Sequence, residues 1–160
     1  MNEEQRRFLY LTMIEGKTYD DVSATLGVHK AELSRWWGMF GDERERMHHW
    51  RTKWRNSLPQ VDFKSFYEKM SSISSCYYCG IHASEIEQLF AQGCIRTKRN
   101  RGRELEVDRM IPNKDYADLD NLVLACYWCN NAKTDEFSAA EFKPIGAVIG
   151  QALRKRLNVL

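Results

Sequence analysis

Two pairs of cysteines carry the clearest chemistry in this sequence: Cys76 and Cys79 in CYYCG, and Cys126 and Cys129 in CYWCNNAK. Each C-x-x-C turn can present two thiolates to one ion, and two such turns supply the four sulfur ligands of a tetrahedral structural zinc site. Neither pair is flanked by the βαβ pattern of a thioredoxin-like redox motif. The sequence therefore predicts that these four cysteines bind a structural Zn²⁺.

The segment between the two pairs predicts a second kind of metal site. Leu105 and Val107 alternate with acidic residues up to Asp108, as in a strand with one buried face, and Pro112 marks its end. The apolar stretch NLVLAC follows as a second strand or as the turn into a helix, and CNNAKTDEFSAAEF is typical of a helix. This order brings Asp108 and Asn130 near the zinc, where a carboxylate and an amide could share a hard divalent cation.

The stretch from residue 76 to about 141 resembles an HNH endonuclease domain of the ββα-metal type, in the subgroup with a four-cysteine zinc knuckle. The family pattern has an Asp-His step on the first strand, an Asn in the loop and C-x-x-C-N-x-x-K opening the helix. This sequence has VDR at Asp108, DNLVLAC at Asn121, and CYWCNNAK at Asn130 and Lys133. The resemblance predicts an α+β fold with a zinc-knuckled ββα-metal domain and flanking helices.

The resemblance also implies roles for these residues. Asp108 and Asn130 would hold one Mg²⁺ ion, or a similar ion such as Mn²⁺, at the scissile phosphate. Asn121 would order the loop, and Lys133 would lie near the DNA phosphates. A single metal ion of this kind acts as a Lewis acid on the developing charge and on the leaving 3′ oxygen.

Arg109 occupies the position at which the family has the histidine that deprotonates water. A guanidinium stays charged at neutral pH and cannot act as that base, but it can bind a phosphate bidentately and stabilise the transition state. The candidates for a replacement base are Tyr116, His82, Tyr78 and Tyr127. Alternatively, bulk hydroxide or a phosphate oxygen serves in a slow enzyme, or the fold has lost catalysis and keeps DNA binding. We favour the first two interpretations, because the other motif positions are all retained.

The first forty residues predict three helices. One stops at Gly16, one is capped by Thr18 and runs to Leu26, and one covers about 29–39 after a turn at Gly27. YDDVSATLGVHKAELSRWW resembles the helix-turn-helix of resolvase-like and sigma-like regulators, in which the third helix lies in the major groove. On its exposed face we expect Lys30, Ser34 and Arg35 to contact DNA. The alternative is an ordinary three-helix bundle with a solvated polar face.

Local charge extends the predicted nucleic-acid surface. The chain has 24 basic and 22 acidic residues and a net charge of +2, so its total charge does not indicate a partner. However, IRTKRNRGR contains no acid, and we expect its Arg99 and Arg101 to contact DNA. ERERMHHWRTKWR predicts a basic helix that ends near Pro59, either a solvated connector or a phosphate-contacting element.

These features predict a helix-turn-helix DNA-binding domain over 1–41, a basic helical linker over 42–60 and an HNH nuclease domain with a C-terminal helix over 61–160. Ser138 and Glu141 form a capping box at the start of that last helix. Ile145, Val148, Ile149 and Leu153 could pack within the domain or form the seam of a homodimer.

The predicted function is metal-dependent cleavage or nicking of double-stranded DNA, of a phage, homing or restriction-like kind. The alternatives are a catalytically inactive, zinc-containing DNA-binding regulator and an RNA- or protein-binding zinc module. No stretch approaches the roughly 20 apolar residues of a membrane span, and the first residues lack the apolar region of a secretory signal. We therefore expect no membrane partner and a cytoplasmic location.

Overall fold

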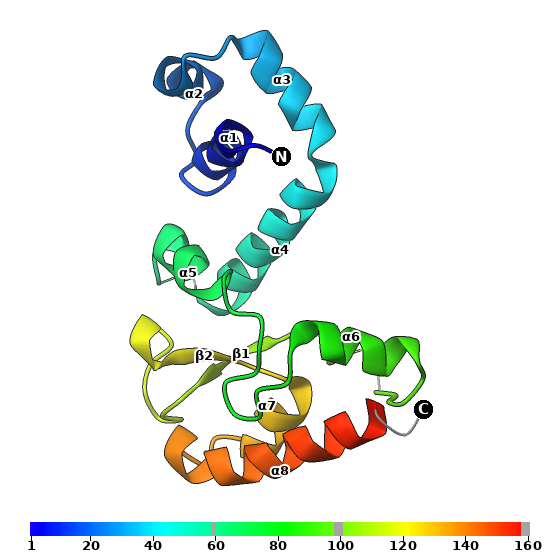
Figure 1. Cartoon of the computed structure of the whole chain (residues 1–160). Helices are drawn as coiled ribbons and strands as arrows, with labels where there is room; N and C mark the ends of the chain where they lie inside the picture. Colours follow the sequence, from blue (N-terminus) through cyan, green and yellow to red (C-terminus); the bar gives the residue numbers. More distant parts are fainter. Residues whose placement is uncertain (59, 98–100, 158–160) are drawn as a thin grey trace. The chain divides into compact units, whose positions relative to one another are not determined.

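The computed structural model in Figure 1 describes residues 1–58, 60–97 and 101–157. The chain divides into two compact units, Met1–Glu68 and Lys69–Leu160. The first unit is helical, and the second combines helices with a two-stranded antiparallel sheet, which confirms the predicted α+β class. Among the described residues, no helix is both long enough and apolar enough to cross a membrane.

The helices of the first unit begin and end largely at the capping residues that the sequence indicated. The Thr18 side chain accepts a hydrogen bond from the Asp21 N–H, and Gly27 closes the second helix with a φ of 68°. The His29 ring caps the third helix. The helices that begin in this unit are α1 Glu3–Met13, α2 Tyr19–Leu26, α3 Lys30–Met39, α4 Gly41–Ser57 and α5 Phe63–Met70, whose last two residues belong to the second unit. The three predicted N-terminal helices and the following basic helix are confirmed, while Pro59 lies outside the described residues.

A small aromatic core holds α1, α2 and α3 together. Its buried members are Phe8, Leu9, Val22, Leu33 and Trp36. The Phe8 ring meets the Trp36 ring edge-on, with the centroids 5.9 Å apart, a geometry that aromatic pairs prefer. Because Leu33 and Trp36 face this core, the intervening Ser34 and Arg35 are exposed on α3.

The second unit is built around the hairpin that the sequence predicted. Its elements are α6 Ala83–Ala91, β1 Glu106–Arg109, the 3₁₀ turn η2 Leu119–Asn121, β2 Leu122–Ala125, α7 Tyr127–Lys133 and α8 Ala139–Leu157. β1 pairs with β2 in antiparallel register, with Asp108 opposite Val123. α7 contacts β1, and α8 contacts both α6 and α7. The predicted order of strand, loop, strand and helix is confirmed.

The prediction of a single helix over CNNAKTDEFSAAEF was wrong, because the helix is interrupted between α7 and α8. Thr134 adopts a φ of 53°, which is uncommon for a β-branched residue, and its hydroxyl donates to the Lys133 carbonyl oxygen at 2.7 Å. α8 then starts at the predicted capping box, in which the Ser138 N–H donates to a Glu141 carboxylate oxygen at 2.9 Å. The break leaves a short turn beside the end of β1.

α6 was not predicted from the sequence, because its capping residue is a histidine. His82 Nδ1 accepts from the Ser84 N–H, and Glu85 accepts from the His82 N–H at 2.7 Å, so the two residues form a reciprocal capping box. The usual signature of this motif begins with Ser or Thr. An H-x-x-E pattern therefore carried the signal.

α8 packs closely on the turn of the first cysteine pair. A Cβ atom added at Gly146 would lie 2.8 Å from the Tyr78 Cβ, and one at Gly150 would lie 2.6 Å from the Cys79 carbonyl oxygen. Leu153 is buried within the unit and so is not available to a partner surface. Val148 and Ile145 are 63% and 43% exposed, and the homodimer stays a prediction.

Candidate functional site

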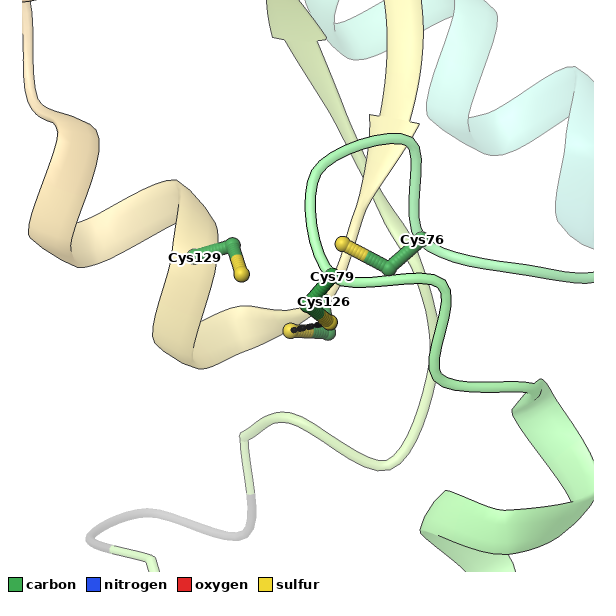
Figure 2. A group of neighbouring side chains, drawn as sticks. All are labelled: Cys76, Cys79, Cys126 and Cys129. Carbon is green, nitrogen blue, oxygen red and sulfur yellow. Dashed lines mark hydrogen bonds between the residues drawn. The ribbon is translucent and has the colours of Figure 1, made fainter. Parts of the chain in front are cut away.

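The four predicted zinc ligands lie together in the second unit, as Figure 2 shows. All four cysteines are buried, and their sulfur atoms lie within 4.8 Å of one another. The Cys79 and Cys126 sulfurs are 3.7 Å apart, close to the roughly 3.8 Å edge of a tetrahedron with metal–sulfur bonds of about 2.3 Å. This arrangement could hold a metal ion and fits zinc.

Backbone contacts fix the two cysteine turns. Cys76 donates its N–H to the Ile81 carbonyl oxygen at 2.9 Å, and the Gly80 N–H donates to the Cys76 carbonyl oxygen at 2.8 Å. The Tyr77 N–H reaches the Leu124 carbonyl oxygen on β2 at 2.9 Å, so the first turn is anchored to the sheet. Cys126 is the N-cap of α7 and Cys129 lies in its first turn.

The thiols at this site oppose one another's ionisation. Hydrogen bonds from the Cys126, Cys129 and Cys79 thiols lower the pKa of Cys76. The Cys126, Cys76 and Cys79 sulfurs, together with burial, raise the pKa of Cys129. The hydrogen bonds that favour the thiolates of Cys76 and Cys79 therefore disfavour those of Cys126 and Cys129. A divalent cation would offset part of the negative charge of four thiolates and stabilise all of them, as in structural zinc sites.

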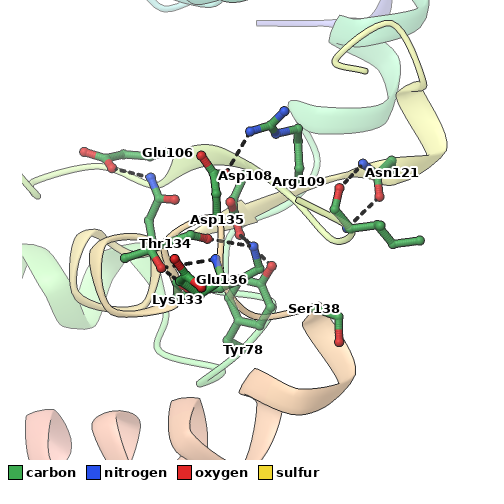
Figure 3. Close-up of polar contacts among 12 residues, drawn as sticks. Tyr78, Glu106, Asp108, Arg109, Asn121, Lys133, Thr134, Asp135, Glu136 and Ser138 are labelled. Carbon is green, nitrogen blue, oxygen red and sulfur yellow. Dashed lines mark hydrogen bonds and ion pairs between the residues drawn. The ribbon is translucent and has the colours of Figure 1, made fainter. Parts of the chain in front are cut away.

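Asp108 is contacted by two buried side chains at one oxygen of its carboxylate (Figure 3). The Tyr78 hydroxyl donates to Asp108 Oδ2 at 2.6 Å, and the Lys133 ammonium lies 3.4 Å from the same oxygen. Asp108 is 8% exposed and Lys133 is fully buried. Lys133 is therefore positioned to balance the charge of Asp108, and its amine is not exposed to solvent.

Asn130 is held by a second, parallel contact between α7 and β1. Its Nδ2 donates to Glu106 Oε2 at 2.7 Å, which leaves Oδ1 as the acceptor atom of the amide. Residues two apart in a strand share a face, so Glu106 and Asp108 are on the same side of β1. Asn130 and Lys133 are one turn apart on α7. The Glu106–Asn130 and Asp108–Lys133 contacts thus bring the two predicted metal ligands to one side of the hairpin.

The Arg109 guanidinium is fixed by three contacts at the end of β1. Its Nη2 lies 2.8 Å from Asp135 Oδ1, and its Nη1 donates to the Lys114 carbonyl oxygen at 3.2 Å. The guanidinium carbon lies 4.4 Å from the centre of the Tyr116 ring. Arg109 and the candidate base Tyr116 are therefore direct neighbours.

Asn121 closes the loop between the two strands. Its Oδ1 accepts from the Ile111 N–H at 2.8 Å, and its Nδ2 donates to the Ile111 carbonyl oxygen at 3.0 Å. Its own carbonyl oxygen accepts from the Met110 N–H at 2.7 Å. The side chain is 3% exposed. These contacts are those of a residue that orders the loop.

The other candidate bases have different surroundings. The His82 Nδ1 lies 2.9 Å from the Ser84 hydroxyl at the start of α6. The Tyr127 ring packs under the Arg101 guanidinium, whose carbon lies 5.2 Å from its centre. Burial, followed by the hydrogen bond to Asp108, raises the pKa of Tyr78. Tyr78 therefore keeps its proton and is a poor base.

The predicted DNA-contacting cations are paired with carboxylates. Lys30 pairs with Asp20, and Arg35 lies 2.6 Å from Glu32 on the same helix. In the second unit, Arg101 lies 3.0 Å from Glu106. Ser34 is exposed on α3, and Arg99 lies outside the described residues.

Sequence reasoning missed two acidic partners in this region. Glu106 holds Asn130, and Asp135 holds Arg109. The available signal for Glu106 was its position two residues before Asp108, which places both on one face of β1. Nothing comparable marked Asp135, because its position follows from the break after α7.

Comparison with known proteins identifies the class of a segment within the second unit. Residues 92–136 match the family model for HNH endonuclease. This segment contains β1, β2, α7 and the second cysteine pair, so the chain carries the HNH endonuclease domain that the motifs predicted. The match supports a nuclease or DNA-binding function in general. Searches of curated proteins and of solved structures found no match.

Proposed function

We propose that the protein is a metal-dependent DNA endonuclease that cuts or nicks double-stranded DNA, of a phage, homing or restriction-like kind. The observation that carries this proposal is the pair of contacts between β1 and α7, Asp108 with Lys133 and Glu106 with Asn130, which places Asp108 and Asn130 on the facing sides of these two elements. The HNH match over the same elements supports it. The zinc held by the four cysteines is structural and fixes the turn that carries Tyr78.

Asp108 and Asn130 are the proposed ligands of one Mg²⁺ or Mn²⁺ ion. Carboxylate and amide oxygens suit such hard cations, which usually keep several positions for water and substrate phosphate. When bound, the ion would supply Lewis-acid stabilisation of the charge on the scissile phosphate and the leaving 3′ oxygen. Lys133 and Tyr78 contribute by holding the Asp108 carboxylate in place.

Arg109 is the proposed phosphate clamp. Its two contacted guanidinium nitrogens still have N–H groups that can donate to a phosphate, because a guanidinium carries five. Stacking on Tyr116 fixes the plane of the guanidinium.

Among the candidate bases, the contacts favour Tyr116, whose ring touches Arg109, over His82, whose ring faces Ser84. The alternative route is a slow reaction in which hydroxide or a phosphate oxygen takes the place of the base. Tyr116→Phe distinguishes the two routes, because it should lower kcat strongly only if Tyr116 is the base.

The first unit is proposed to position the nuclease on DNA. α3 would lie in the major groove, with Lys30, Ser34 and Arg35 toward the DNA, and Arg99 and Arg101 would contact the backbone. The proposed division is a helix-turn-helix domain over 1–41, a basic helical linker over 42–60 and the nuclease domain over 61–160. Exposure of Ser34 and Arg35 beside a buried Leu33 supports the assignment of this face.

The test is cleavage of supercoiled plasmid and of a randomised duplex library in Mg²⁺ or Mn²⁺. Asn130→Ala should abolish cleavage and leave DNA binding intact, because it removes a metal ligand without leaving a buried charge. Asp108→Asn should do the same, and its combination with Lys133→Met checks for the effect of an unpaired buried ammonium. Asp115→Asn, on the exposed loop, is the matched control. Zinc content and circular dichroism verify the fold of each variant.

Cleavage that persists in Asn130→Ala and in Asp108→Asn would contradict the proposed metal site. The second candidate function is a catalytically inactive zinc-containing DNA-binding regulator. The replacement of the histidine base by Arg109 is the observation that favours it. Tight, salt-sensitive binding to duplex DNA without cleavage in either metal would support that function.

A further inference from the structure

Tyr78 connects the zinc site to the candidate catalytic carboxylate. It lies between Cys76 and Cys79 in the first cysteine turn, and its hydroxyl donates to Asp108 Oδ2 at 2.6 Å (Figure 3). The Tyr78 side chain is 5% exposed. Because Asp108 is also buried, the two side chains contact each other directly and away from solvent.

The two buried donors near Asp108 both contact the same oxygen of its carboxylate. Tyr78 and Lys133 both approach Oδ2. The Lys133 distance of 3.4 Å is long for a charge-assisted hydrogen bond, so the tyrosine makes the shorter and more directional contact. Neither donor contacts Oδ1, so that oxygen is the one we assign to a cation.

The Tyr78 ring has little freedom to move. The Phe142 ring of α8 meets it edge-on, with the centroids 5.3 Å apart, and the Tyr77 ring meets it edge-on from the other neighbouring position at 5.3 Å. The absence of a side chain at Gly146 lets the α8 backbone approach the Tyr78 Cβ. Its hydroxyl is thus held by packing, by the zinc turn and by α8.

We propose that Tyr78 is a positioning residue that fixes Asp108 for monodentate binding of the catalytic divalent cation through Oδ1. The inference rests on the proposed function, because it takes Asp108 as a metal ligand. Residues that orient a ligand typically contribute about 10–100-fold to metal affinity. The cysteine turn therefore sets how tightly the nearby catalytic cation binds.

Mn²⁺ binding to the zinc-loaded full chain, measured by calorimetry without DNA, tests this role independently of activity. Tyr78→Phe removes only the hydroxyl, and we expect it to weaken Mn²⁺ binding about tenfold while zinc content stays unchanged. Tyr77→Phe is the matched control on the same turn and should bind Mn²⁺ as tightly as the unmodified protein. Asp108→Asn should lose Mn²⁺ binding.

The outcomes separate the two proposals. Unchanged Mn²⁺ affinity in Tyr78→Phe, with binding lost in Asp108→Asn, would overturn the role of Tyr78 and leave the proposed function intact. Unchanged affinity in Asp108→Asn would overturn the metal site itself.

A second measurement uses the unmodified protein, in case Tyr78→Phe fails to fold. With ¹³C-labelled tyrosine, the Tyr78 Cζ resonance should shift during Mg²⁺ titration with the same midpoint as a Mg²⁺ titration followed by calorimetry, and the Tyr77 resonance should not. A Tyr78 resonance that does not move while Mg²⁺ binds would also overturn the inference.

Discussion

At the scale of single residues, Arg109 is a permanent cation at the position where the HNH family pattern has a titratable histidine. Its three contacts differ in strength. The stack on Tyr116 and the bond to the Lys114 carbonyl oxygen involve neutral groups, whereas the partner Asp135 is an exposed anion. A phosphate that approaches Arg109 would compete with Asp135 alone, because both are anions that seek the same donors.

This competition predicts the effect of Asp135→Asn. An exposed ion pair contributes only about 0–1 kcal/mol to stability, so the free energy of unfolding should change little. Affinity for duplex DNA should rise by about threefold to tenfold, because loss of the carboxylate frees Arg109 and removes a repulsive charge. Fluorescence anisotropy in Ca²⁺ measures the affinity. Glu136→Gln changes the same charge one residue away, and an equal rise there would mean that only net charge matters.

Replacement of Arg109 by lysine tests the phosphate clamp. Lysine keeps the positive charge but loses the planar fork that binds phosphate with two parallel bonds. We expect Arg109→Lys to lower kcat by about 100-fold or more, as loss of a preorganised donor to a transition-state oxyanion does, with a smaller change in KM. Single-turnover kinetics with saturating DNA measures this. A kcat equal to that of the unmodified enzyme would show that charge alone is sufficient.

The sequence predicted which residues would bind metal, but not which contacts hold those residues in place. The cysteine pairs and the motif positions of Asp108, Asn121 and Asn130 are read from local spacing. In contrast, Tyr78 and Asp108 are 30 residues apart, and Glu106 and Asn130 are 24 apart. Those partnerships depend on the approach of α8 and the register of the hairpin, and no local pattern encodes either.

At the scale of elements, α8 determines the position of the first cysteine turn through its two glycines. A methyl group at Gly146 would lie 2.8 Å from the Tyr78 Cβ and 3.1 Å from its backbone. Overpacking of this kind typically costs about 1–3 kcal/mol. We therefore expect Gly146→Ala to lower the free energy of unfolding, measured in urea, although alanine favours helices.

Gly38 of α3 provides the matched control for that substitution. A Cβ atom there would meet nothing within 4 Å, so Gly38→Ala should stabilise its helix by about 0.5–1 kcal/mol through helix propensity alone. Stabilisation by both substitutions would contradict close packing of α8 on the cysteine turn.

The start of α8 should make stability depend on pH. Hydrogen bonds from the Ser138 hydroxyl and N–H lower the pKa of Glu141 from its ordinary value of 4.5. A lowered folded-state pKa means that the contribution is complete above the unfolded-state pKa and is lost as pH falls through the folded-state value. The difference in Tm between the unmodified protein and Glu141→Gln should thus be constant near neutral pH, shrink as pH falls below the unfolded-state pKa of about 4.3, and disappear once pH has fallen through the lowered folded-state pKa. A difference that persists at pH 2 would contradict this.

Local signals also explain which elements the sequence predicted. Thr18 and Gly27 are common capping residues, so the N-terminal helices could be read directly. α6 is capped by His82, which is not a usual capping residue, and α7 ends before Thr134 because that residue adopts a positive φ. Neither is encoded by hydrophobic periodicity.

At the scale of the whole molecule, four of the described cations that we propose to contact DNA form ion pairs with carboxylates. The pairs are Lys30 with Asp20, Arg35 with Glu32, Arg101 with Glu106 and Arg109 with Asp135. The pairing of these cations with carboxylates is consistent with a net charge of only +2. DNA binding would exchange carboxylate partners for phosphates, and the affinity would then fall as salt rises, because phosphate contacts release counterions.

The two compact units have separate sources of stability, and zinc removal should distinguish them. The core of Met1–Glu68 consists of packed aromatic and aliphatic side chains, whereas Lys69–Leu160 contains the four-cysteine site. Structural zinc contributes directly to folding. We expect Cys129→Ser, or a strong chelator, to abolish amide protection in β1, β2 and α7 while Phe8, Val22 and Leu33 stay protected. Hydrogen exchange followed by mass spectrometry measures both regions at once.

Simultaneous loss of protection in both units would show that the chain unfolds as one cooperative structure. Retained protection throughout would show that the cysteines stabilise the second unit without a metal.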